Sequence, residues 1–127
     1  MSSQTPPVSQ PPTDGAQKLS LHTLLKVMLD KGASDLHITT ASPPQLRIDG
    51  QLVPLKTPPL SPADTKQLCY SVLTDAQKHQ FEEENELDLS FGVKGLARFR
   101  ANVFVQRGAV AAAFRRMPYE IKTIEEL

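Results

Sequence analysis

The C-terminal half of the sequence contains three consecutive runs in which apolar and polar residues alternate. These runs cover residues 87–93, 96–105 and 109–115, and the links between them are Lys94-Gly95 and Arg107-Gly108. Alternation places every second side chain on the same face of a strand, and short links that contain glycine join antiparallel neighbours. This pattern predicts a three-stranded antiparallel meander with one buried face.

The first foldable segment has helical spacing instead. Apolar residues recur at intervals of three and four between Leu21 and Leu29, which forms one face of a helix. Ser20 is a suitable N-cap, and Gly32 suits the left-handed position after the helix end. We therefore expect structure to begin at Ser20.

Three shorter strands should follow this helix. Alternating runs cover residues 34–39, 45–48 and 51–53, and Asp49-Gly50 is a tight-turn signal between the last two. Pro43-Pro44 separates the first run from the second. The last two runs are expected to form a hairpin.

Two more helices are predicted between the two groups of strands. Ser61-Pro62-Ala63-Asp64 has a capping serine, a proline at the first helical position and an acid in the first turn. The apolar face of this helix is expected to include Leu68, Cys69, Val72 and Leu73. Thr74-Asp75-Ala76-Gln77 matches a second capping box and predicts a helix to about Glu84, with Asn85 as its stop.

The expected fold is therefore α+β, in the order αβββααβββ. It is a PAS-like, mostly antiparallel sheet of about six strands with helices packed on one side. Residues 1–18 are Pro-, Ser- and Gln-rich with little to bury, so we expect a disordered tail, followed by one domain over residues 19–119.

Composition excludes several classes of protein. Fourteen Lys and Arg balance fourteen Asp and Glu, which argues against a general binder of nucleic acid or anionic membranes. The single cysteine, Cys69, excludes an internal disulfide, and no apolar run is long enough for a membrane helix. A reduced, cytosolic, soluble chain is expected.

Known catalytic motifs are missing. The sequence has no G-x-x-x-x-G-K-[ST], and none of its six glycines precedes Lys-Ser or Lys-Thr. His22, His37 and His79 lie on different expected elements, and their spacing, with or without Cys69, favours no metal site. We expect neither a catalytic residue nor a metal site in this chain.

Two polar groups have more than one interpretation. Asp35 and His37 stand two apart on a strand and so share a face; acid–base chemistry is possible there, but a polar face that orients the strand is favoured. The acidic stretch at residues 82–86 could hold a metal or a basic partner, but a solvated surface is favoured.

The arginines are more informative. Arg98, Arg100 and Asn102 alternate with the apolar residues Phe99, Ala101, Val103 and Val105, so the two guanidinium groups should point outward together. Arg115 ends the next strand. Such groups suit phosphate or carboxylate, although a solvated, salt-bridged sheet face is the simpler interpretation.

Several runs resemble the N-terminal domain of the PilT family of pilus-retraction motors, within the type II/IV secretion ATPases. They are Gly32-Ala33-Ser34-Asp35-Leu36-His37-Ile38-Thr39, Pro43-Pro44-Gln45-Leu46-Arg47-Ile48-Asp49-Gly50, Leu87-Asp88-Leu89-Ser90-Phe91 and Ala97-Arg98-Phe99-Arg100-Ala101-Asn102. The resemblance covers residues 19–127. It implies that residues 120–127 begin a linker to a RecA-like ATPase domain that the sequence does not include.

The resemblance also implies a function in twitching motility. It predicts a regulatory and assembly domain of a hexameric, cytoplasmic ATPase that associates with the inner membrane through the platform protein of the pilus machine. The domain would pack on a RecA-like domain of its own or a neighbouring subunit and would contact nucleotide phosphates, with Arg98, Arg100 and Arg115 as candidates. ATP and Mg would be used by the full-length protein, and nucleic acid would not be a partner.

Other functions remain open on the sequence. A pilus-extension or type II secretion ATPase has the same kind of domain but usually carries a further N-terminal domain. A stand-alone PAS-like sensor would need a large apolar cavity for its ligand. An independent enzyme is disfavoured by the missing motifs.

Overall fold

The computed structural model describes residues 19–118. Helices and strands follow one another as one helix, three strands, two helices and three strands, which confirms the predicted αβββααβββ order. The predicted tail at residues 1–18 and the predicted linker at 120–127 lie outside the described residues.

The boundaries of the elements agree closely with the sequence patterns. The helices are α2 (Leu21–Asp30), α3 (Pro62–Tyr70) and α4 (Asp75–Glu84). The strands are β2 (Asp35–Ile38), β3 (Gln45–Ile48), β4 (Gln51–Pro54), β5 (Glu86–Val93), β6 (Ala97–Gln106) and β7 (Ala109–Arg116).

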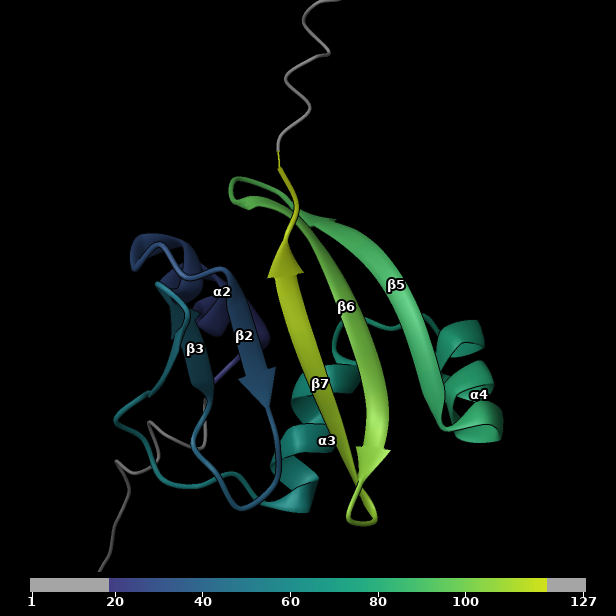
Figure 1. Cartoon of the computed structure of the whole chain (residues 1–127). Helices are drawn as coiled ribbons and strands as arrows, with labels where there is room; N and C mark the ends of the chain where they lie inside the picture. The colour runs from purple at the N-terminus through teal and green to yellow at the C-terminus, as the bar shows by residue number, and fades with distance from the viewer. Residues whose placement is uncertain (1–18, 119–127) are drawn as a thin grey trace, which may run out of the picture.

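All six strands form one antiparallel sheet in the order β4-β3-β2-β7-β6-β5. The first three strands and the last three are each a local meander. The two meanders are joined because β2, near the start of the chain, pairs with β7 at its end. Figure 1 shows these two strands side by side at the middle of the sheet.

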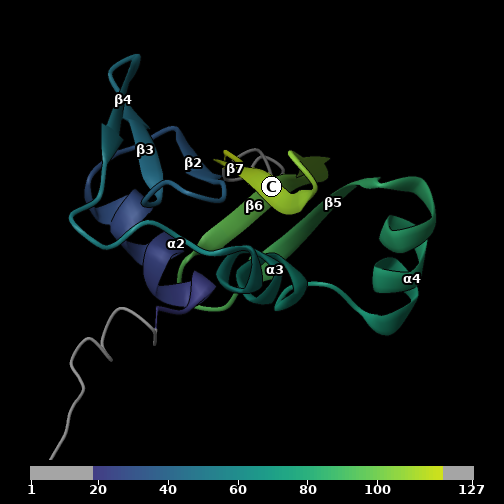
Figure 2. The same ribbon diagram turned by 90° about the horizontal axis from the view of Figure 1, so that it is seen from below.

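The hydrophobic core lies between one face of the sheet and the helices. Leu36, Phe99 and Phe114 of the central strands are fully buried, as are Leu24 and Met28 of α2. Figure 2 shows α2 and α3 on the same side of the sheet, and α4 packs against the edge strand β5. The predicted packing of helices on one side is confirmed.

The opposite face of the sheet, called the open face here, carries the other residue of each alternating pair. Many of these residues are polar, but Phe104 of β6 and Ala111 and Ala113 of β7 also lie on this face. In β6 the predicted alternation is confirmed, because Phe99, Ala101 and Val103 are buried and Arg98 and Arg100 are exposed. Val105 differs from the prediction and is 42% exposed. It lies one residue from the end of β6, next to the turn to β7.

Local sequence signals set the helix ends. Ser61 and Asp64 form a reciprocal capping box, as do Thr74 and Gln77. Asn85 ends α4 in the left-handed conformation, with a φ of 62°. Helix α3 is shorter than predicted and ends at Tyr70, so that Val72 and Leu73 reach the core from the connection to α4.

The tight turns also follow the predictions. Asp49 and Gly50 both have positive φ, and so do Arg107 and Gly108. Two consecutive residues of this kind match a type I′ turn, whose twist suits an antiparallel hairpin. These turns align the β3–β4 and β6–β7 pairs, and thereby the side chains of the open face.

Candidate functional site

Four charged side chains form a row across the open face. Arg47 of β3 lies opposite Asp35 of β2, Asp35 lies opposite Arg115 of β7, and Arg115 lies opposite Arg100 of β6. Directly opposed residues of antiparallel strands share a face and have adjacent side chains. We call this set the arginine row; its three arginines and one aspartate give it an excess of positive charge.

Asp35 is at the centre of the row. Its Oδ1 lies 3.5 Å from Arg115 Nε, and its Oδ2 lies 3.9 Å from Arg47 Nε. The Asp35 side chain is only 14% exposed, whereas that of Arg115 is 71% exposed. Arg47 also donates from Nη1 to the carbonyl of Gly50 at 3.0 Å. Asp35 and Arg47 are therefore held from two sides, and Arg115 from one.

Arg100 is the least satisfied charge in the row. It has no ion-pair partner within residues 19–118, and Arg115 is its cross-strand neighbour. The nearby carboxylate of Asp88 instead accepts a hydrogen bond from Asn102 Nδ2 at 2.7 Å. Like charges directly opposite one another are unfavourable, so this pair of arginines is suited to an anion that contacts both.

The surface is hollowed on both sides of the Asp35–Arg115 ion pair. A hollow of about 180 Å³ includes Arg100, Asn102 and Asp88 in its lining. A second hollow, of about 550 Å³, is lined in part by Arg47 and Arg116. Asp35 and Arg115 line both hollows, so the guanidinium of Arg115 can serve a ligand in either of them.

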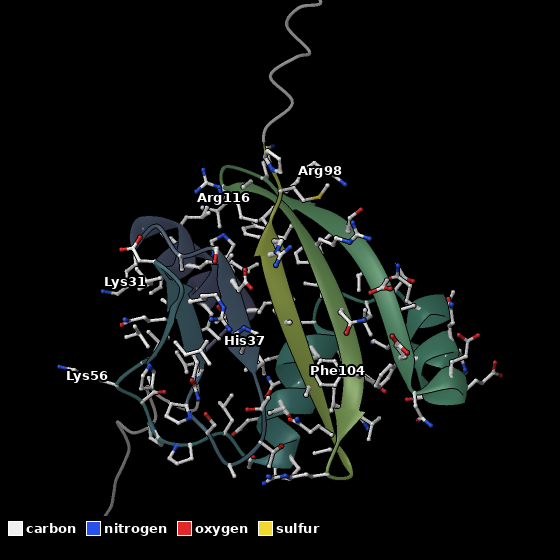
Figure 3. The ribbon with its side chains drawn as sticks, viewed as in Figure 1. Lys31, His37, Lys56, Arg98, Phe104 and Arg116 are labelled. Atoms are coloured by element: carbon white, nitrogen blue, oxygen red, sulfur yellow. The ribbon has the colours of Figure 1, made fainter. Side chains whose placement is uncertain are left out.

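The three arginines predicted from the sequence do not all lie in the row. Arg100 and Arg115 lie opposite each other, and Arg98 lies two residues before Arg100 on β6. The Arg98 side chain covers Gly92 of β5, where an added Cβ would lie 3.1 Å from Arg98 Nη1. Arg98 is thus directed away from β7, near the end of the sheet where Figure 3 also places Arg116.

Two members of the row were missed as functional residues by sequence reasoning. The sequence predicts only that Asp35 shares a strand face with His37, whereas in the structure the Asp35 oxygens contact arginines of two other strands. The sequence places Arg47 on a predicted strand and assigns it no further role. The polar alternation of both strands was a usable signal, but the link from Asp35 to Arg115 depends on the pairing of β2 with β7.

His37 is the next open-face residue of β2 after Asp35 (Figure 3). Its Nε2 is buried and has no hydrogen-bond partner within the described part of the chain. Burial lowers the pKa of His37, the Arg47 charge lowers it further, and the Asp35 charge opposes the change. The imidazole is therefore disposed to remain neutral, which does not favour its use as the acid of an Asp–His pair.

Other titratable and apolar features have structural roles or no assigned role. Burial raises the pKa of the Cys69 thiol to about 12, so this cysteine is an inert core residue. Among residues 19–118, no three His, Cys, Asp or Glu side chains gather as a metal site.

No helix in this range has the length and hydropathy to cross a membrane. The acidic stretch at residues 82–86 is exposed, which agrees with the favoured interpretation of a solvated surface.

An apolar groove lies on the helix side of the sheet. It measures about 440 Å³ and its lining includes Leu21 and Leu25 of α2, Leu68 of α3 and Val93 of β5. The groove is partly open to solvent and lies between α2, α3 and the end of β5. It therefore differs from the large internal cavity that a PAS-like ligand sensor would need.

Comparison with known proteins identifies close relatives by sequence. No family model matches the chain. The chain is 40% identical over 109 residues to "Type IV pilus retractation ATPase PilT" of Pseudomonas aeruginosa, covering 86% of this chain and 32% of that protein. It is 36% identical to the type IV pilus ATPase PilU of the same organism, of which it covers 28%. The chain spans about a third of the length of these relatives.

Comparison with solved structures also finds a pilus retraction ATPase. The crystal structure of the pilus retraction motor PilT with bound ADP matches with a TM-score of 0.76 and 48% identity, over 81% of this chain and 30% of that one. The ATPase DotB of Legionella pneumophila matches with a TM-score of 0.66 at 20% identity, over 79% of this chain and 30% of that one, and shows the shared fold.

Proposed function

This chain belongs to the PilT family, and we propose that it serves as the regulatory and assembly domain of a hexameric type IV pilus retraction ATPase. In this proposal the open face packs against a RecA-like domain of the same or a neighbouring subunit. The arginine row then faces the bound nucleotide, and Arg100 and Arg115 contact its phosphates. The full-length protein hydrolyses ATP with Mg, and this domain alone does not, because its sequence carries no phosphate-binding loop.

The observation that carries the proposal is the opposition of Arg100 and Arg115 on neighbouring strands. Each guanidinium offers a planar fork of donors that matches phosphate oxygens. Two such groups on a rigid sheet can stabilise the charge on the transferring phosphoryl group without reorganising. The relative with bound ADP supports nucleotide as the ligand of the full-length protein.

The remaining parts of the proposal concern the cellular setting. We propose a cytoplasmic protein that acts in twitching motility and reaches the inner membrane through the platform protein of the pilus machine. Nucleic acid is not a proposed partner, because the chain has no net positive charge. The relatives named for pilus retraction favour this function over pilus extension or type II secretion.

The test is ATP turnover by a full-length ring that contains this domain. Arg100→Ala and Arg115→Ala should each lower turnover by at least about tenfold, since a charge at a phosphoryl-transfer site is worth this much or more. Arg98→Ala should have a smaller effect because Arg98 is directed over β5. Arg107→Ala, in the turn at the other end of β6, is the matched control and should leave turnover unchanged.

Ring assembly must be measured on the same samples, for example by mass photometry. Wild-type turnover by intact hexamers of Arg100→Ala and Arg115→Ala would exclude the phosphate contact. Loss of the hexamer in these variants would instead assign the two arginines to assembly alone.

A further inference from the structure

We infer that Asp35 is an internal counter-ion that holds Arg115 in the absence of nucleotide and is displaced from it by phosphate. This inference rests on the proposed phosphate-binding role of the arginine row. The Asp35 carboxylate is the only acidic group within residues 19–118 that forms an ion pair with the row, at 3.5 Å from Arg115 and 3.9 Å from Arg47. Asp35 is thus a positioning residue with an effect on ligand affinity.

Competition between Asp35 and a phosphate follows from their positions. A phosphate that contacts both Arg100 and Arg115 must share the Arg115 guanidinium with Asp35 or replace it. The Asp35 side chain is mostly buried, so water screens its charge less than it would screen a surface carboxylate. Two anions on one guanidinium repel each other. Phosphate binding is therefore weaker while Asp35 keeps its contact with Arg115.

The exchange leaves no unpaired charge behind. Arg115 is 71% exposed and can turn toward the hollow next to Arg100. Arg47 is held in place by its hydrogen bond to the Gly50 carbonyl, and it remains as the partner of Asp35. Asp35 therefore has one fixed partner and one exchangeable partner.

The inference predicts a gain of affinity when the Asp35 charge is removed. Pyrophosphate binding by the 127-residue chain would be titrated at low ionic strength by calorimetry or NMR. Asp35→Asn should tighten binding about tenfold, because a unit charge close to a multivalent anion contributes this order of magnitude. Asp88→Asn is the matched control: it removes the same charge from the same face, but the Asp88 carboxylate is bonded to Asn102.

A double-mutant cycle tests whether the effect passes through Arg115. The gain from Asp35→Asn should disappear in an Arg115→Ala background, whereas any smaller gain from Asp88→Asn should persist. In the wild-type chain, the Nε–H signal of Arg115 should shift on addition of pyrophosphate, as its partner changes from carboxylate to phosphate. This second measurement does not depend on the folding of any variant.

The outcomes separate this inference from the proposed function. If Arg100→Ala and Arg115→Ala weaken pyrophosphate binding but a folded Asp35→Asn leaves it unchanged or weaker, the counter-ion inference is overturned and the phosphate contact stands. Wild-type affinity for pyrophosphate in both arginine variants rejects the proposed site itself. Failure of folded Asp35→Asn to bind pyrophosphate at millimolar concentration also overturns the inference.

Discussion

Arg100 and Arg115 lie directly opposite each other on β6 and β7, with their side chains on the face of the sheet that α2 and α3 leave open. The backbone of two paired strands fixes the spacing of these charges. Arg115 has Asp35 on its other side, and Arg100 has no charged partner among the described residues. The stability of the domain should therefore not depend on Arg100.

Truncation of Arg100 should leave the fold intact. Arg100→Ala should change the free energy of unfolding of the isolated domain by no more than ~0.5 kcal/mol, as at other exposed sites. Relief of the repulsion from Arg115 favours a small gain. Urea unfolding followed by circular dichroism measures this value, and a loss above ~1 kcal/mol would show that Arg100 has a structural role.

Phe99 should behave in the opposite way. It is fully buried, and its ring lies 5.9 Å from that of Phe91 in the aromatic part of the core. Phe99→Ala should destabilise the domain by ~3–5 kcal/mol through lost burial and a residual cavity. Phe104→Ala is the control on the same strand: Phe104 belongs to the open face and is partly exposed, so its loss should cost clearly less. Equal losses measured by urea unfolding would contradict this assignment of faces.

His37 should make stability sensitive to mild acid. Its pKa in the folded state lies below the ordinary value of 6.5, mainly because of burial. Below about pH 6.5 the unfolded state binds the proton more readily, so unfolding becomes more favourable as the pH falls toward the folded pKa. Above pH 6.5 this contribution to stability is fully present.

The His37 contribution is isolated by comparing variants. Thermal unfolding measured from about pH 7.5 to about pH 5, a range that brackets the ordinary histidine pKa, should show a steeper loss of stability for the wild type than for His37→Gln. His79→Gln, on α4, controls for the loss of a histidine elsewhere in the chain. Parallel slopes for wild type and His37→Gln would rule out this source of acid sensitivity.

Cys69 should be protected from thiol reagents while the domain is folded. Its side chain is fully buried, and burial raises its pKa to about 12, so almost no reactive thiolate exists near neutral pH. Modification by a disulfide reagent at pH 8 should be slow in buffer and rapid in denaturant. Fast reaction of the folded chain would place Cys69 outside the core.

The sequence alone determined the elements of this fold and the faces of its strands. The capping boxes at Ser61 and Thr74 and the turn at Asp49-Gly50 are interactions between near neighbours, so they can be recognised without the rest of the chain. The alternation around Phe99 likewise predicted that Arg98 and Arg100 are exposed. Helix α3 ends earlier than predicted, and the apolar residues Val72 and Leu73 pack against the core from the connection that follows it, which apolar spacing alone does not distinguish from a longer helix.

Only the tertiary structure decided which charged residues meet. Asp35 and Arg115 are eighty positions apart, and each belongs to a local meander that its own turns can form. Pairing of β2 with β7 joins the two halves so that one apolar face lies beneath α2 and α3. Burial of this shared face is a property of the whole core. The local alternation around Asp35 and Arg47 gives the face of each residue but not the strands that pair, so the arginine row emerges only when the sheet is assembled.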